Sequence, residues 1–199
     1  MKFNNDMLRL YAVTDRHWTG EQTLYEQVRD VLMGGATCLQ LREKDLDEAS
    51  FYEEAKNIKE LCRLFDVPFI INDNVMLAKE IDADGVHVGQ DDMACIKARE
   101  ILGPDKIIGV SAHTIEEARI AKEQGADYLG VGAIFPTSSK DDAEVLGIKR
   151  LKEMTETVDL PMVAIGGISY DNCLLLKDTG IDGIAVISAL FGQKHIKQA

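Results

Sequence analysis

The chain has 199 residues, of which 46% are hydrophobic, so it is long enough to bury a core without disulfides or a structural metal. Its formal net charge of -12 argues against nucleic acid and against an anionic membrane surface as partners. Anionic small molecules stay open as substrates, because clustered Lys, Arg and backbone N–H groups reverse the field inside a cleft. No linker-like stretch interrupts the sequence, which predicts one domain over residues 1–199.

Eight short apolar segments recur along the chain. They cover residues 8–15, 37–43, 68–73, 84–89, 106–112, 127–132, 161–167 and 182–188. The stretches between them, such as EQTLYEQVRDVLMGG and TIEEARIAKEQGA, place apolar residues at the three-to-four spacing of helices. Alternating strands and helices predict parallel pairing, and eight repeats match an α/β fold of the (β/α)8 TIM-barrel type. A doubly wound open sheet is the competing fold, but YAVTDRHWTG has no G-x-G-x-x-G turn.

In such a barrel, reactive groups gather at the carboxyl ends of the strands, which we call the mouth. The second segment ends in QLREK, where side chains alternate across the strand. Gln40, Arg42 and Lys44 then point one way, while two leucines and Glu43 point the other. Two cations on one face of the mouth suit a polyanion such as pyrophosphate. An ordinary solvated strand end is the alternative.

Carboxylates follow the third and fourth segments. IIND places Asn72 and Asp73 after the third, and HVGQDD places Asp91 and Asp92 after the fourth. Asp73 and Asp92 so close to the predicted cations are best explained by a Mg²⁺ that bridges them to phosphate oxygens. The alternative for Asn72 or Asp73 is a helix N-cap, a position where both residue types are favoured.

The fifth segment ends in GVSAHT, which places Ser111 and His113 at the mouth. His113 is equally suited to open the next helix. His87 lies within the fourth segment, where a hydrogen-bonded interior histidine is more common than a general base.

Glycines follow the seventh segment, in AIGGIS, and Ser188 ends the eighth, in AVISAL. Backbone N–H groups at these two places form the usual phosphate site of a barrel. The polar groups therefore predict two anion sites: a metal-bound pyrophosphate between the second and sixth strands, and a phosphate monoester at the seventh and eighth. No Ser/His/Asp arrangement or reactive-cysteine motif is recognisable.

The four cysteines are widely spaced and form no C-x-x-C pair. The charged start MKFNND does not resemble a signal peptide, and no apolar run is long enough to span a bilayer. We therefore expect reduced thiols in a cytoplasmic protein, and no metal site built from cysteines.

Eight motifs in this order and spacing resemble the thiamine-phosphate synthase (thiamine-phosphate pyrophosphorylase) family, over about residues 10 to 190. They are YAVTD, QLREK, IIND, GVHVGQDD, GVSAHT, DYLGVGAIFPTSSK, VAIGGI and AVISAL. The resemblance implies a (β/α)8 barrel. It also implies a transferase that joins 4-amino-5-hydroxymethyl-2-methylpyrimidine diphosphate to hydroxyethylthiazole phosphate, giving thiamine phosphate and pyrophosphate, with Mg²⁺ as cofactor.

The resemblance also implies a role for each matching position. Gln40 and Ser111 contact the pyrimidine, Arg42, Lys44 and Asn72 bind its diphosphate, and Asp73 and Asp92 bind Mg²⁺. Thr137, Ser139 and Lys140 hold the diphosphate and the thiazole substrate, and Gly167, Ile187 and Ser188 hold the thiazole phosphate. Arg42, Lys44, Ser111 and Lys140 are the residues expected to assist catalysis.

The loop FPTSSKDD, residues 135–142, is compatible with two interpretations. Its composition alone is typical of a solvated turn. The resemblance instead makes it a substrate loop, which we expect to close over the mouth as a lid and exclude water, while Asp141 and Asp142 face solvent.

Two other functions remain open. A sister group with this barrel isomerises a thiazole carboxylate phosphate, but it generally lacks the full diphosphate and metal set that Arg42, Asp73, Asp92 and Lys140 form here. A phosphate-ligand sensor without catalysis is the second alternative, because a fold does not by itself imply turnover.

Overall fold

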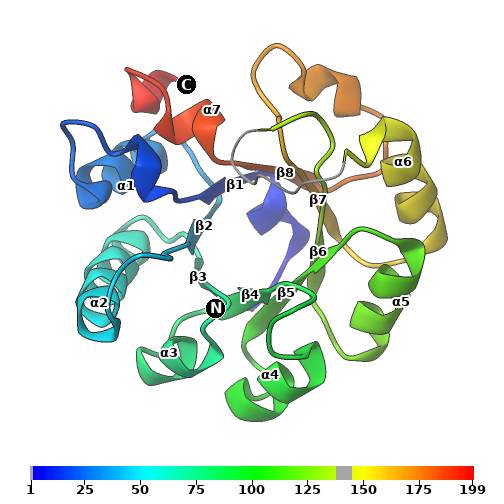
Figure 1. Ribbon diagram of the computed structural model, residues 1–199, viewed down its shortest axis with the longest axis horizontal. Coiled ribbons are helices and arrows are strands. Elements are labelled where there is room, and N and C mark those ends of the chain that lie inside the picture. The colour runs from blue at the N-terminus through cyan, green and yellow to red at the C-terminus, as the bar shows by residue number, and fades with distance from the viewer. Residues whose placement is uncertain (1, 138–144) are drawn as a thin grey trace.

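Eight parallel strands pair in sequence order and close into a barrel in the computed structural model, which describes residues 2–137 and 145–199 (Figure 1). The strands are β1 (Leu10–Val13), β2 (Cys38–Leu41), β3 (Phe69–Asn72), β4 (Gly85–Val88), β5 (Ile107–Ala112), β6 (Tyr128–Val131), β7 (Met162–Ile165) and β8 (Gly183–Val186). Each strand lies inside one of the eight predicted segments. The prediction of a (β/α)8 barrel is therefore confirmed.

Helices surround the barrel as an outer ring (Figure 1). The α-helices are α1 (Leu24–Met33), α2 (Glu48–Leu64), α3 (Val75–Glu80), α4 (Cys95–Leu102), α5 (Ile115–Glu123), α6 (Gly147–Thr157) and α7 (Ser188–Phe191). The 3₁₀ helices are η1 (Asn5–Leu8), η2 (Arg16–Trp18), η3 (Cys173–Leu176) and η4 (Ile196–Gln198).

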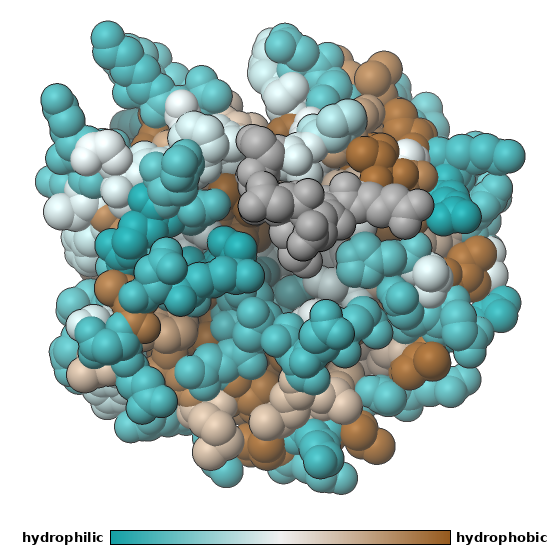
Figure 2. Space-filling model, in the orientation of Figure 1, coloured by the Kyte–Doolittle hydropathy of each residue, from teal (hydrophilic) through white to brown (hydrophobic). Residues whose placement is uncertain are grey.

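The unit between β7 and β8 departs from the repeat, because its helical part within the described residues is the single 3₁₀ turn η3. This short turn leaves Tyr170, Leu174 and Leu175 largely exposed. Figure 2 shows apolar side chains gathered at the upper right of the molecule, where this segment and α6 lie. The last α-helix has only four residues, in keeping with the short FGQKHIKQA stretch.

Side-chain caps fix where several helices begin. Thr23 and Glu26 form a reciprocal capping box at α1, and Asp47 caps α2 through Ser50 N–H. At α3 the cap is Asn74, whose side chain accepts from the N–H of Leu77 at 2.9 Å. The capping alternative for Asn72 and Asp73 is therefore wrong. At α5 the cap is Thr114 rather than His113.

The barrel separates two apolar clusters. The larger one fills the layer between strands and helices, where Leu39 and Leu41 lie fully buried. The smaller cluster fills the barrel itself and includes Tyr11 and Tyr128. Helix η1 lies within the ring of strands, and Phe3 stacks on Tyr128 with ring centroids 6.1 Å apart (Figure 1). The amino-terminal segment thus lies at the end of the barrel opposite the mouth, where the carbonyl oxygen of Leu8 approaches Gly183 at the start of β8.

All four cysteines, Cys38, Cys62, Cys95 and Cys173, are free thiols. Burial raises the pKa of Cys38, Cys62 and Cys95 above the ordinary thiol value, so they remain protonated. Within the described residues, no helix combines the length and the apolarity that crossing a bilayer demands.

Candidate active site

The end of β2 has the alternation that the sequence predicts. Gln40 faces the barrel interior, where its Nε2 donates to the Tyr11 hydroxyl at 2.9 Å. Arg42 follows at the mouth, and its backbone N–H donates to Thr14 Oγ1 at 2.9 Å, which ties the ends of β1 and β2 together. Lys44 is exposed. The rim of the mouth on this side therefore carries two cations above a buried amide.

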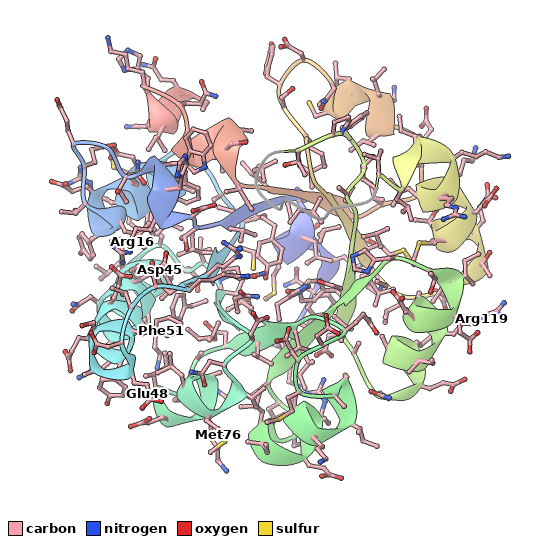
Figure 3. All side chains as sticks on the ribbon, in the orientation of Figure 1. Arg16, Asp45, Glu48, Phe51, Met76 and Arg119 are labelled. Atoms are coloured by element: carbon pink, nitrogen blue, oxygen red, sulfur yellow. The ribbon has the colours of Figure 1, made fainter. Side chains whose placement is uncertain are left out.

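Glu43 points away from the mouth, as predicted, and a cation from the neighbouring loop holds it there. Arg16 donates from Nε to Glu43 Oε2 at 3.2 Å and from Nη2 to Glu54 Oε2 of α2 at 2.6 Å. Figure 3 labels Arg16 and Asp45 higher in the view than Phe51 and Glu48 of α2. Desolvation raises the pKa of Glu43 although Arg16 opposes that shift. This ion cluster fixes the segment that carries Arg42 and Lys44.

The two predicted metal ligands meet at the mouth. Asp73 has a left-handed backbone with φ 61°, and the side chain of Asn72 donates to its Oδ1 at 2.8 Å. Asp92 accepts the N–H of Gly89 at 2.7 Å and lies within hydrogen-bonding reach of the Asp73 carboxyl. The structure therefore brings these two carboxylates, from the ends of β3 and β4, close together at the mouth.

The pKa of Asp73 reflects how close the two carboxyl groups lie. Burial and then the Asp92 carboxyl raise the pKa of Asp73 to about 6, while Lys44 and Arg42 oppose the shift. Two facing carboxylates with cations nearby form a hard-oxygen donor set. No group of three or more His, Cys, Asp or Glu side chains in the described part of the chain is arranged around a common point. Two carboxylates completed by substrate phosphate oxygens fit Mg²⁺ better than a closed protein cage would.

A hydrogen-bonded row of five side chains crosses the barrel below the mouth, and we call it the interior network. Gln40 contacts Tyr11, the hydroxyls of Tyr11 and Tyr128 are 2.7 Å apart, and His87 Nδ1 lies 3.0 Å from the Tyr128 hydroxyl. His87 Nε2 lies 3.0 Å from Ser111 Oγ. His87 is thus buried and hydrogen-bonded at both ring nitrogens, the arrangement that is more common for a histidine within a strand.

Sequence reasoning missed Tyr11 and Tyr128. Both are 1% exposed, and burial raises the pKa of each hydroxyl well above its ordinary value. Strand alternation would have placed them inside, since Tyr11 is one residue from the outward-facing Ala12, but their aromatic rings suit a strand without any further role. The sequence places Gln90 in the loop after β4 without giving it a role; its Nε2 donates to the Ser111 carbonyl at 2.6 Å.

The far side of the mouth is built from the ends of β6, β7 and β8. Gly166 and Gly167 have φ 95° and 66°, and a Cβ on Gly167 would lie 2.7 Å from the carbonyl oxygen of Phe135. Only glycine fits where the two loops approach this closely. Ile187 precedes α7 and Ser188 begins it, both partly buried.

The substrate loop is only partly within the described residues. Thr137 is described and partly buried. Ser139 and Lys140 lie outside the described residues, as do Asp141 and Asp142, so their predicted roles and the lid remain predictions.

A family model described as thiamine monophosphate synthase matches residues 10–190 of this sequence. The chain belongs to that family. A thiamine-phosphate synthase of Clostridium acetobutylicum is 49% identical over 189 residues, which cover 95% of this chain and 90% of that protein. One from Methanobrevibacter smithii is 47% identical, over 98% of this chain and 93% of the relative.

A solved structure supports the same conclusion. Thiamine phosphate pyrophosphorylase from Pyrococcus furiosus superposes with a TM-score of 0.90 at 44% identity, covering 98% of this chain and 93% of that one. The family predicted from the eight motifs is thus confirmed, and the matched range coincides with the range that the motifs span.

Proposed function

We propose that this protein is a transferase of thiamine biosynthesis that couples 4-amino-5-hydroxymethyl-2-methylpyrimidine diphosphate with hydroxyethylthiazole phosphate. The products are thiamine phosphate and pyrophosphate. The observation that carries the proposal is the meeting of Asp73 and Asp92 with Arg42 and Lys44 at one point of the mouth, in a member of this family. The thiazole isomerase alternative has no use for such a diphosphate and metal site.

The diphosphate binds at the rim of the mouth, where the charges are. Arg42 and Lys44 supply positive charge, and Asn72 offers its amide. Asp73 and Asp92 are the residues that would hold Mg²⁺, which when bound supplies further positive charge against the departing diphosphate. A Mg²⁺ ion would need no third protein ligand here, because Mg²⁺ is usually held by one or two carboxylates together with substrate phosphates.

The pyrimidine enters the interior side of the mouth, between Gln40 of β2 and Ser111 of β5. Support comes from the burial of Gln40 and from the hydrogen bonds that hold both side chains in place. These two residues orient the ring so that its reactive carbon faces the second substrate.

The thiazole phosphate binds across the mouth. Gly167, Ile187 and Ser188 would form its phosphate site, and the backbone conformation of Gly167 suits a close approach by an anion. Thr137, Ser139 and Lys140 would complete the pocket from the loop after β6. The positive charge of Lys140 is assigned to the diphosphate.

The reaction needs little from the protein beyond orientation and charge. The 4-amino group of the pyrimidine donates electron density as the carbon–oxygen bond to diphosphate breaks, which leaves a stabilised carbocation. The neutral thiazole nitrogen then forms the new carbon–nitrogen bond. No proton has to be removed from the nucleophile, so a general base is not required. Arg42, Lys44 and Lys140 stabilise the leaving charge.

The test is direct. The purified protein is incubated with both substrates and Mg²⁺, and the products are identified by mass. We expect thiamine phosphate and one equivalent of pyrophosphate, neither of which forms when one substrate is omitted. Well-folded protein that binds both substrates without product would support the sensor alternative, and turnover of a thiazole carboxylate phosphate would support the isomerase.

A further inference from the structure

The interior network links the two residues assigned to the pyrimidine, although they lie on opposite sides of the barrel. It begins at Gln40 on β2, passes through Tyr11 and Tyr128, and reaches Ser111 on β5 through His87. Each of its four contacts measures between 2.7 and 3.0 Å. The two tyrosines, Gln40 and His87 are buried, and only Ser111 is partly open toward the mouth.

Hydrogen counting gives this network a direction. The Gln40 amide nitrogen can only donate, so the Tyr11 oxygen accepts from it. Burial raises the pKa of both tyrosines, so each keeps one hydroxyl hydrogen to donate. If Tyr11 donates to Tyr128, then Tyr128 donates to His87 Nδ1. A neutral imidazole that accepts at Nδ1 carries its hydrogen on Nε2 and donates it to Ser111 Oγ.

The opposite direction is less favourable. It would have His87 donate from Nδ1 to Tyr128, and Tyr128 donate to Tyr11. The Tyr11 oxygen would then accept twice, and its own hydrogen would turn to the thiol sulfur of Cys38, which lies within hydrogen-bonding reach. A sulfur is a weaker acceptor than a hydroxyl oxygen. The 2.7 Å separation between the two tyrosine oxygens fits either direction, so the weaker acceptor at Cys38 is what favours the first.

We propose that the interior network is a one-way hydrogen-bond relay that fixes His87 as its Nε2–H tautomer and Ser111 as a donor toward the mouth. Tyr11, Tyr128 and His87 are then positioning residues, because they act on the ligand through Gln40 and Ser111. At one end Ser111 accepts from His87, and its own hydrogen is directed to the ligand. At the other end Tyr11 fixes one N–H of Gln40, which orients the Oε1 acceptor.

The direction of the hydrogen bonds selects a class of ligand, and this inference about the ligand rests on the proposed function. An acceptor at Gln40 and a donor at Ser111 match an aminopyrimidine, whose amino group donates and whose ring nitrogen accepts. A pyrimidine with an oxo group in place of the amino group presents an acceptor to Gln40 and leaves its Oε1 unpaired. Tyr11, Tyr128 and His87 would thus disfavour 4-oxo analogues without contacting them, because they fix the orientation of Gln40 and Ser111.

The first experiment tests the relay without any substrate. The protein is labelled with ¹⁵N histidine, and long-range ¹H–¹⁵N spectra report which ring nitrogen carries the hydrogen. Only four histidines are present, and His17, His113 and His195 are exposed, so their glutamine variants assign the His87 signals. We expect a neutral Nε2–H tautomer for His87 near pH 7.5. A neutral Nδ1–H tautomer or a charged imidazolium would overturn the proposal.

Two conservative variants then distinguish an effect on the direction of the hydrogen bonds from a general disturbance of the structure. Tyr128→Phe removes the donor to His87, so the His87 signals should shift toward the Nδ1–H tautomer. Tyr11→Phe leaves Tyr128 able to donate to His87, so the tautomer should stay unchanged although Gln40 loses its partner. A tautomer shift in both variants, or in neither, would contradict a one-way relay. Thermal melting checks that both variants fold.

The final experiment connects the relay to the ligand through a double-mutant cycle. We expect Tyr128→Phe to lower kcat/KM for the pyrimidine diphosphate by about tenfold, the factor that one hydrogen bond contributes. The KM for the thiazole phosphate should change less than about twofold, because the relay does not reach that site. In a Ser111→Ala background the tenfold effect should shrink to below about twofold, since the hydroxyl through which Tyr128 acts is gone.

The exposed Tyr25 on α1 provides the matched control, and Tyr25→Phe should match the parent protein. Undiminished loss in the Ser111→Ala background would refute the action through Ser111. A correct tautomer pattern with no effect of either Tyr128→Phe or Ser111→Ala on coupling would instead refute the assignment of Ser111 to the pyrimidine, while the relay itself stands.

Discussion

Gly109 on β5 should be among the least replaceable residues of the barrel interior. A Cβ at this position would lie 2.5 Å from His87 Nδ1 and closer still to the Cζ and hydroxyl oxygen of Tyr128. Neither ring has room to withdraw: Tyr128 is 1% exposed and stacked on Phe3, and His87 is hydrogen-bonded at both ring nitrogens. Gly109→Ala therefore forces the two rings apart.

The cost follows from overpacking. Forcing extra volume into a packed interior typically costs about 1 to 3 kcal/mol, and here two rings must move, so we expect about 3 kcal/mol or more. For a chain of this size each kcal/mol corresponds to roughly 2 to 4 °C in melting temperature. Gly109→Ala should therefore melt about 6 to 12 °C below the parent. Because the Tyr128–His87 contact opens, turnover at 25 °C should fall as well.

Gly130→Ala on the neighbouring strand β6 is the matched control. Its Cβ would lie 3.0 Å from His87 Cε1 and 3.3 Å from Nε2, so His87 has to shift by only a few tenths of an ångström. We expect a melting point within about 4 °C of the parent, a cost of roughly 1 kcal/mol. Circular dichroism melting curves of the three proteins decide the matter. A Gly109→Ala protein that melts as the parent does, or above Gly130→Ala, would refute the packing argument.

Four further predictions concern the mouth and the ion cluster of Arg16, Glu43 and Glu54 beside it. Asp92→Asn keeps the shape of the side chain but removes the charge of a proposed metal ligand. Mg²⁺-dependent coupling should fall at least about 100-fold, and the melting point should stay nearly unchanged. Normal coupling would rule out Asp92 as a ligand. Lys140→Ala should lower kcat much more than it weakens thiazole phosphate binding, and equal losses in kinetics and calorimetry would contradict its assignment to the diphosphate. Gly167→Ala, at φ 66° and against neighbouring carbonyls, should raise the KM for the thiazole phosphate more than that for the pyrimidine diphosphate; an equal rise in both would argue against its place in that site. Desolvation raises the pKa of Glu43 above 4.5, so the parent protein loses stability as the pH rises through the raised value and Glu43 ionises. Glu43→Gln has no such ionisation, so its melting point relative to the parent should increase from pH 4.5 to pH 7. A relative melting point that falls over this range would contradict the sign.

The strands were predictable because each one carries its own local signal. An apolar run such as PFIIND is bounded by polar or glycine residues, and its β-branched content separates it from the helices. The same signal located Gln40, Arg42, Asp73 and Asp92, since strand ends in a parallel barrel all open at one mouth. These site residues required no knowledge of distant contacts.

The parts that sequence reasoning missed depend on contacts between remote residues. Asn74 competes with Asn72 and Asp73 for the same helix cap, and the local sequence offers no ground for choosing among them. The turn η3 contains an apolar LLL triplet, yet it ends within four residues. Tyr11 and Tyr128 are 117 positions apart, and nothing in either strand indicates that their hydroxyls meet.

The distribution of charge within the barrel fits a reaction that passes through a cation. Ionised groups stay at the rim, where water and the counter-charges of the substrates reduce the cost of burying them. Below the rim the interior network consists of amide, hydroxyl and imidazole side chains and includes no carboxylate. On the proposed mechanism, a pyrimidine cation formed there would face oriented dipoles rather than an anionic side chain that would capture it. The division between a charged rim and an interior without carboxylates therefore fits both the cost of burying ions and the proposed reaction through a cation.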